Sequence, residues 1–298
     1  MTSLETPTKN SSCPKGATFI FKTSALTPYM DYETNVHDWR TNEIDIKPKR
    51  HLQTEICALG ALYLQPLPQY QIFDVSSLSS LDNKTIVTVR SNGNLVAFVS
   101  ALWIAVDGLP DPVLHTGITV IHEQHRRSSV KRLLFVNLFL TVLQEYPQGI
   151  WISSLAGIIT SLVHLTKYVE KVYPSPAWKI TQGTAQPSEL HLQIAREMSA
   201  KHRPQMHISP SAVFDEAKFV FLGSNDWEKG RVFMRGLDDP TNSHNDRVAT
   251  EYFQRLFRPN AGNEVLQVGF LGFSTIASAA KDEAHSIQAA AAVYLSKL

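Results

Sequence analysis

Residues 122–135 read HEQHRRSSVKRLLF and place four basic side chains and two serines directly ahead of a strongly apolar run. The first backbone N–H groups of a helix lack partners inside the helix and carry partial positive charge, so a helix that begins here can hold a phosphate. Cations at this end of a helix oppose its dipole and therefore favour a bound anion. The alternative is purely structural, because Ser128 or Ser129 is also a good N-cap for a core helix.

The sequence on both sides of this stretch predicts a succession of strands and helices. KTIVTVR (84–90) and LVAFVSALWIAV (95–106) flank an SNGN turn, which is a strong signature of a β-hairpin. The elements expected next are a strand over 113–122, a helix over 129–144, a strand over 148–155 and a helix over 157–173. Pro174 ends the last of these.

The outer parts of the chain carry looser patterns. The elements expected there are a strand over 17–24, helices over 50–65, 188–201, 247–257 and 275–297, and strands over 217–222 and 264–271. We therefore predict an α/β protein with a mixed sheet and flanking helices. Residues 1–16 are expected to form a flexible tail, 17–176 the main domain, and 177–298 a C-terminal α/β extension.

The charge balance and the lack of a long apolar segment exclude several partners. The 28 Lys and Arg side chains nearly cancel the 27 Asp and Glu, to a formal charge of +1. A protein that binds nucleic acid usually has a large basic excess, so no nucleic-acid partner is expected. The longest apolar run, Leu133 to Leu143, is far shorter than the roughly 20 residues that span a bilayer. We therefore expect no membrane association.

Cysteine and histidine spacing bears on the compartment and on metals. Cys13 and Cys57 cannot build a disulfide framework, and the first residues lack the apolar core of a signal peptide, which favours a cytoplasmic protein. The histidines show no HxxxH spacing, so no metal site is expected.

The order hairpin, strand, basic helix start, helix, strand, helix over residues 84–173 resembles the core of the GNAT (N-acetyltransferase) superfamily. GNLVAFVSALWI (93–104) is similar to its second and third strands, and ITVIHEQHRRSSVKRLLFVNLF (118–139) to its cofactor motif, a strand followed by R-x-x-G-x-G/A and a helix. The resemblance implies a V-shaped opening between the strands at 113–122 and 149–155, with the helix at about 129–144 beginning at that opening.

The same resemblance implies acetyl-CoA or another acyl-CoA as acyl donor, its pyrophosphate held at the helix start. The residues implied in cofactor binding are Ile121, Arg126, Arg127, Ser128, Ser129, Val130 and Lys131. Ser129 and Lys131 occupy the two glycine positions, where a glycine lets phosphate approach the backbone. Arg126, Arg127 and Lys131 would then bind phosphate by side-chain charge.

The resemblance also implies a base on the central strands and a tyrosine acid on the helix after the next strand. Tyr168 stands at the position of that tyrosine, although it can equally be a packed helix residue. His115 and His122 lie seven residues apart on one expected strand, so they face opposite sides and at most one lines the acceptor cleft. Glu123 is a further candidate base, or it balances the arginines.

Three functions remain open at this point. The first is an N-acyltransferase that moves an acyl group from a thioester to a small-molecule or peptide amine, with residues 177–298 shaping the acceptor pocket or a homodimer interface. The second is a binding or assembly protein whose cofactor site is degenerate. The third is another enzyme acting on a CoA-bound or carrier-bound thioester. Fold alone does not choose among them.

Overall fold

The computed structural model describes residues 18–23, 32–40, 46–68, 71–176, 186–226 and 235–276. Its strands are β1 (Thr18–Thr23), β2 (Tyr32–Asp38), β3 (Lys84–Ser91), β4 (Asn94–Ile104), β5 (Val113–Ile121), β6 (Ile150–Ala156), β7 (Glu170–Tyr173), β8 (Val213–Asp215), β9 (Val220–Leu222) and β10 (Glu264–Leu271). Its α-helices are α1 (Ile46–Ala61), α2 (Val130–Glu145), α3 (Ile159–Leu165), α4 (Glu189–Lys201) and α5 (Arg247–Phe257). Short 3₁₀ helices are η1 (Gln71–Phe73), η2 (Leu78–Leu81) and η3 (Glu123–His125).

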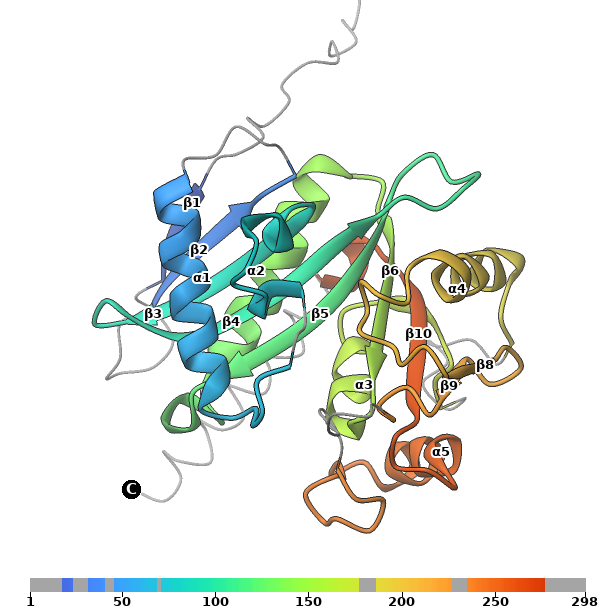
Figure 1. Ribbon diagram of the computed structural model, residues 1–298. Helices are drawn as coiled ribbons and strands as arrows, with labels where there is room; N and C mark the ends of the chain where they lie inside the picture. Colours follow the sequence, from blue (N-terminus) through green and yellow to red (C-terminus); the bar gives the residue numbers. More distant parts are fainter. Residues whose placement is uncertain are drawn as a thin grey trace, which may run out of the picture.

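The strands form one mixed sheet in the described part of the chain (Figure 1). Their order is β1–β2–β3–β4–β5–β6–β10–β9–β8, and β7 pairs with β10 off this path. Each pair is antiparallel except β5 and β6, which are parallel. The predicted α/β fold class is confirmed. The C-terminal segment supplies β10, which lies next to β6 near the middle of the sheet.

The predicted hairpin is confirmed as β3 and β4. Asn92 and Gly93 form its turn with φ of 51° and 78°. Two positive φ values in succession match the right-handed twist of the flanking strands, and Asn-Gly is the pair that adopts them at lowest cost. This turn sets the register in which β4 pairs with β3.

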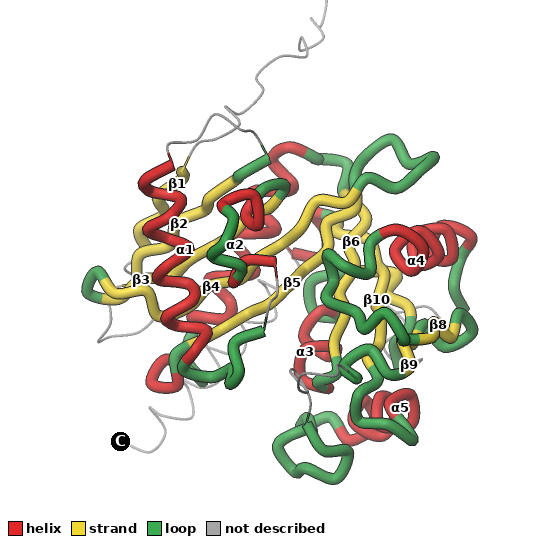
Figure 2. Tube along the Cα trace, in the orientation of Figure 1, coloured by secondary structure: helices red, strands yellow, loops and turns green. Residues whose placement is uncertain are grey.

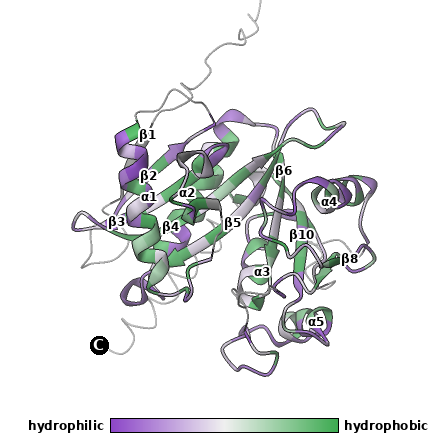
Figure 3. Cartoon of the chain, viewed as in Figure 1, coloured by the Kyte–Doolittle hydropathy of each residue, from purple (hydrophilic) through white to green (hydrophobic). Residues whose placement is uncertain are grey.

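Helices cover both faces of the sheet (Figure 2). Successive strand residues face opposite sides, and along β4 Ala97 and Val99 pack with α2 whereas Phe98 packs with α1. Along β10, Val265 packs with α3 and α5, whereas Leu266 packs with α4. Because both faces are covered, the central strands are largely hydrophobic (Figure 3). The face that carries α1 and α4 is called the α4 face below, and the opposite one the α2 face.

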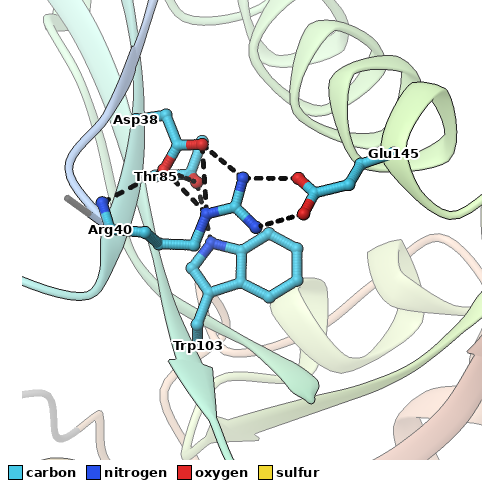
Figure 4. A network of polar contacts seen from close by, with 5 residues as sticks. All are labelled: Asp38, Arg40, Thr85, Trp103 and Glu145. Carbon is cyan, nitrogen blue, oxygen red and sulfur yellow. Dashed lines mark hydrogen bonds and ion pairs between the residues drawn. The ribbon is translucent and has the colours of Figure 1, made fainter. Parts of the chain in front are cut away.

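A polar network fixes the far end of α2 to the sheet (Figure 4). Arg40, just after β2, pairs with Asp38 and donates from Nη1 and Nη2 to the Glu145 carboxylate at 3.0 and 2.6 Å. Its guanidinium lies 4.3 Å from the ring centroid of Trp103, whose Nε1 donates to Thr85 Oγ1 at 2.9 Å. A planar guanidinium can satisfy two carboxylates and a ring at once. The network therefore anchors the C-terminal end of α2, the helix whose other end borders the cleft described below.

The prediction of one helix over 157–173 is wrong. The helix α3 ends at Leu165, and Glu170–Tyr173 forms the strand β7, which pairs with β10. The side chains of Val169 and Val172 pack so closely on Gly269 that a Cβ there would lie 2.6 and 2.9 Å from them. This contact with a strand almost 100 residues later outweighs the helical spacing, and it leaves Tyr168 in the turn between α3 and β7.

Other boundaries differ less. Strand β2 was not predicted. The expected helix over 50–65 is α1 (Ile46–Ala61). Strand β5 ends at Ile121, so His122 follows the strand instead of belonging to it. The strand over 217–222 is shortened to β9, with β8 pairing beside it. The expected tail over 1–16 lies outside the described residues, as does most of the expected helix over 275–297.

Candidate functional site

The parallel strands β5 and β6 separate along their length (Figure 1). They pair only at Leu114–Ile152, His115–Ser153 and Thr116–Ser154. Beyond Thr116, β5 stays with β4 through a bulge and continues to Ile121, while β6 stays with β10. An extra residue in one strand bends it away from its neighbour. The predicted V-shaped opening is therefore present, and α2 begins beside it.

The opening is a cleft of about 630 Å³. Its walls are the unpaired half of β5 from Gly117 to Ile121 and the end of β6 from Ser154 onward. On the α2 face it is closed by Lys131, Phe135 and His164. On the α4 face it is bordered by His115, Met206, His207 and Glu264, and Arg235 lines it from the loop that packs beside α3 and α5. The cleft therefore runs through the sheet, with one side at the start of α2 and the other under the C-terminal segment.

The start of α2 is capped by Ser128. Its Oγ donates to the carbonyl of His125 at 2.6 Å and accepts from the N–H of Val130 at 3.3 Å. Ser129 stands at the N-cap position but makes no side-chain cap, and the side chain of Val130 is fully buried in the core. Of the two serines that the sequence left as capping alternatives, the structure selects Ser128.

Two of the predicted phosphate-binding cations line the cleft. Arg126 donates from Nε to the carbonyl of Ile121 at 3.2 Å, and its guanidinium lies 4.4 Å from the ring centroid of Tyr63. Burial and the nearby Lys167 lower the pKa of Lys131 to about 8. No carboxylate in the described part of the chain pairs with Arg126 or Lys131. Both positive charges and the positive end of the α2 dipole therefore lie at the cleft, and no carboxylate among the described residues neutralises them.

Arg127 differs from its neighbour. Both arginines are exposed, but Arg127 is not among the residues that line the cleft, and its φ of 66° lies in the left-handed region that favours glycine. Arg127 occupies this conformation directly before the helix start, where the chain turns from η3 into α2. The candidate phosphate contacts are accordingly Arg126 and Lys131.

Of the two predicted histidines, His115 lines the cleft. Its Nδ1 lies 2.9 Å from Ser153 Oγ, and burial lowers its pKa to about 4, so it is neutral at pH 7. His122 follows β5 and borders a separate hollow together with His125, whose ring centroid is 5.9 Å away. Glu123 is exposed and makes no ion pair with a described residue, so it does not balance the arginines. The prediction that at most one of these two histidines lines the main cleft agrees with this geometry.

Tyr168 lies in the core beside α2. Its side chain is 4% exposed, and its ring stacks on Phe135 with centroids 6.5 Å apart and packs 5.2 Å from the ring of His164. It is not among the residues that line the cleft. Its role as a proton donor stays a prediction, and the packing provides a structural role in any case.

Glu264, the first residue of β10, was not predicted from the sequence. It is 6% exposed, lines the cleft, and accepts a hydrogen bond of 2.5 Å from Ser224 Oγ. Burial raises its pKa to about 7, although the Ser224 bond acts in the opposite direction. The available signal was a single acid at the start of the strand EVLQVGFL. A carboxyl group with a pKa near neutral, inside a cleft, is a candidate for proton transfer.

Comparisons with known proteins give a partial likeness. No protein-family model matches the sequence, and no curated protein matches it. Among solved structures, the chain is similar to Escherichia coli ElaA, with 18% identity, 48% of this chain and 91% of that chain covered, and a TM-score of 0.32. A ribosomal-protein-alanine N-acetyltransferase from Brucella melitensis is 21% identical, with 32% of this chain and 67% of that chain covered and a TM-score of 0.27. An aminoglycoside N-acetyltransferase in complex with CoA is 13% identical, with 40% of this chain and 75% of that chain covered and a TM-score of 0.27.

The chain thus resembles GNAT N-acetyltransferases over a segment. At TM-scores this low, the likeness carries no information on a substrate. Within the described residues, no group of three or more His, Cys, Asp or Glu side chains is placed to hold a metal ion. No α-helix in the same part of the chain has the length and apolar character needed to cross a bilayer.

Proposed function

We propose that the protein is an acyl-CoA-dependent N-acyltransferase. Acetyl-CoA or another acyl-CoA would be the donor, and a small-molecule or peptide amine the acceptor. The observation that carries the proposal is the cleft between the separated ends of β5 and β6, at which α2 begins with Arg126 and Lys131 lacking a described counter-ion. A diphosphate is the kind of group that such a helix start attracts.

The residues present fit this donor on two counts. First, a half-buried lysine whose pKa is lowered by burial and by a second lysine gains most from a bound anion. Second, the edge of β5 from Gly117 to Val120 has no partner on the β6 side, so the backbone N–H and C=O groups on that edge are available to the amides of an extended ligand. The pantetheine arm of CoA is such a ligand.

The glycine positions of the motif do not contradict the proposal. Ser129 is only partly buried and its hydroxyl makes no capping bond, so it is available as a donor. The side chain of Lys131 lines the cleft, where its charge would act on a phosphate directly. Side-chain cations would thus supply part of the attraction that glycine-rich motifs obtain from backbone alone.

Calorimetric titration with CoA tests the proposal. The native protein should bind CoA with micromolar affinity, and the double variant Arg126→Ala/Lys131→Ala should bind it about 100- to 20,000-fold more weakly, because each of the two charged hydrogen bonds contributes about 1.5–3 kcal/mol. Affinity for pantetheine, which lacks the diphosphate, should barely change. The matched control Arg196→Ala/Lys218→Ala removes two exposed cations that pair with Glu216 and Asp215 away from the cleft, and should bind CoA normally.

The competing functions have their own signatures. No binding by the native protein at millimolar CoA would overturn the proposal and favour a binding or assembly protein. Release of free CoA from acetyl-CoA without acylation of any added amine would favour a thioester-processing enzyme. Formation of an amide in step with CoA release would support the acyltransferase.

A further inference from the structure

The cleft has an acceptor side whose charges differ from those at the start of α2. On the α4 face it is bordered by His115, His207 and Glu264. Burial lowers the pKa of both histidines, so they are neutral near pH 7. The group left to carry charge on this face is the carboxyl of Glu264, while the guanidinium of Arg235 lines the cleft from the loop beside α3 and α5.

Glu264 is the only carboxylate among the described residues that line the cleft. No described cation forms an ion pair with it: Ser224 Oγ donates to its carboxyl group at 2.5 Å, and the side chain of Asn225, also neutral, lies beside it and lowers its pKa. A buried carboxyl group without a counter-ion is costly once ionised, and a positively charged ligand offsets that cost. Arg235 lines the same cleft but donates from Nη1 to the carbonyl and hydroxyl of Thr241 at 2.9 and 3.2 Å, not to Glu264.

The position of Glu264 is set by the sheet. Val265 pairs with Ala156 at the end of β6, so Glu264 stands one residue beyond that pair, at the edge of the cleft. Its neighbour two residues along, Leu266, packs with α4, which places Glu264 on the α4 face, as His115 is. Lys131 and Phe135 close the opposite side. A donor lying at α2 and an acceptor at Glu264 would therefore meet from opposite faces of the sheet.

We infer that Glu264 binds the ammonium group of the acyl acceptor and takes its proton, and that the acceptor is a monoamine entering from the α4 face. This inference rests on the proposed function. The ammonium nitrogen gives one proton to the Glu264 carboxylate, and its freed electron pair forms the C–N bond with the acyl carbon. The C–S bond breaks with its pair on sulfur, and the second proton leaves the nitrogen for the thiolate. Glu264 then returns its proton to water.

The restriction to a monoamine follows from the charges of the cleft. One carboxylate can neutralise one ammonium, and a second positive charge on the acceptor would meet the cations that line the cleft, Arg235 and Lys131. Like charges in a cleft of low dielectric repel strongly. An acceptor with an anionic group would instead gain from Arg235.

Three amines with the same five-carbon chain test the acceptor class, with acetyl-CoA as donor. We expect pentylamine and δ-aminovalerate to be acetylated with kcat/KM values about 10-fold or more above that of cadaverine, which carries a second ammonium. The opposite order, with cadaverine preferred, would overturn the monoamine inference. The comparison uses only the native protein and one donor, so the result does not depend on whether a variant folds.

Variants of Glu264 test its role. Glu264→Gln should lower kcat/KM for pentylamine by about 100- to 10,000-fold while CoA affinity is unchanged. The matched control Glu216→Gln removes an exposed acid away from the cleft and should leave activity unchanged. In the native protein, a plot of kcat/KM against pH should show a rising limb with its midpoint near pH 7, where Glu264 loses its proton. Glu264→Gln should abolish this limb. Because the Ser224 hydrogen bond lowers the pKa of Glu264, Ser224→Ala should move the limb to higher pH.

The outcomes separate the two proposals. If the native protein binds no CoA, the proposed function fails first. If the native protein acetylates amines and Glu264→Gln retains full kcat/KM with the same pH limb, Glu264 is a structural carboxyl and the inference is overturned. Should Glu264→Gln fail to fold, the shift of the limb in Ser224→Ala decides, and an unmoved limb counts against Glu264.

Discussion

His115 and Ser153 form a buried hydrogen bond, with 2.9 Å between Nδ1 and Oγ, at the middle of the three pairs that join β5 to β6. One pair further on, at Thr116 and Ser154, the strands part and the cleft begins. The bond therefore lies at the apex of the V. Because the imidazole of His115 is buried and neutral, the serine hydroxyl satisfies a ring nitrogen that has no access to water.

Removing this hydroxyl should destabilise the apex. Ser153→Ala leaves His115 Nδ1 buried without its partner, and we expect a loss of about 1–3 kcal/mol in the free energy of unfolding, measured by urea denaturation. The adjacent Ser154→Ala is the matched control, because Ser154 is partly exposed at the cleft and faces the other side of β6; its loss should stay within about 0.5 kcal/mol. Equal losses in the two variants would contradict the assignment.

The left-handed residue before α2 gives a second prediction. Arg127 has a φ of 66°, which costs a non-glycine residue about 1 kcal/mol. Arg127→Gly should therefore raise the free energy of unfolding by up to about 1 kcal/mol, and CoA affinity should change little because Arg127 does not line the cleft. Arg126→Gly, at a φ of −66°, should instead lower stability, because it relieves no strain, gives the unfolded chain more freedom and removes the contacts of Arg126 with the Ile121 carbonyl and the Tyr63 ring. A loss of stability in both variants would show that the backbone of Arg127 is not strained.

The parts of the fold that rest on local pattern could be predicted from the sequence, and those that rest on distant contacts could not. The Asn92–Gly93 turn, the β5 strand and the start of α2 are local features, and they were placed to within a few residues. Strand β7 was mistaken for helix because Val169 and Val172 have helical spacing, and only Gly269 on a distant strand decides their conformation.

The same reason limits prediction of the site. The phosphate-binding candidates Arg126 and Lys131 could be named, because they belong to one contiguous stretch at a helix start. Glu264 could not, because its partner Ser224 lies 40 residues away and the cleft exists only once β10 has joined β6. Tyr168 was named from its position in a pattern, but the turn that replaces the helix places its ring in the core.

Lys131 provides a prediction about proton uptake. Its pKa is lowered to about 8, so about half of the molecules carry a neutral amine at pH 8. A bound diphosphate favours the charged form and raises this pKa, so CoA binding at pH 8 should take up as much as about half a proton. Calorimetry in two buffers of different ionisation enthalpy measures the uptake directly.

The control for this uptake keeps the charge. Lys131→Arg remains protonated at pH 8, so CoA should still bind while the uptake disappears. Lys218→Arg, whose lysine pairs with Asp215 at the surface, should leave the uptake as in the native protein. Tight CoA binding by the native protein without any buffer dependence would show that Lys131 is not at the diphosphate.

Glu264 should make stability depend on pH, whatever the substrate. Its pKa is raised from 4.5 to about 7 in the folded protein, so the folded state holds its proton more tightly than the unfolded chain. Raising the pH from about 4.5 to above 7 therefore destabilises the native protein, by about 3 kcal/mol from this group alone. Glu264→Gln has no ionisation at this position, so relative to the native protein it should gain stability on going from pH 5 to pH 8. Urea denaturation at the two pH values measures the gain. Glu216→Gln, whose acid is exposed and has its pKa lowered by Arg196, should show no such gain. A difference between Glu264→Gln and the native protein that is the same at both pH values would mean that Glu264 does not hold its proton near neutral pH.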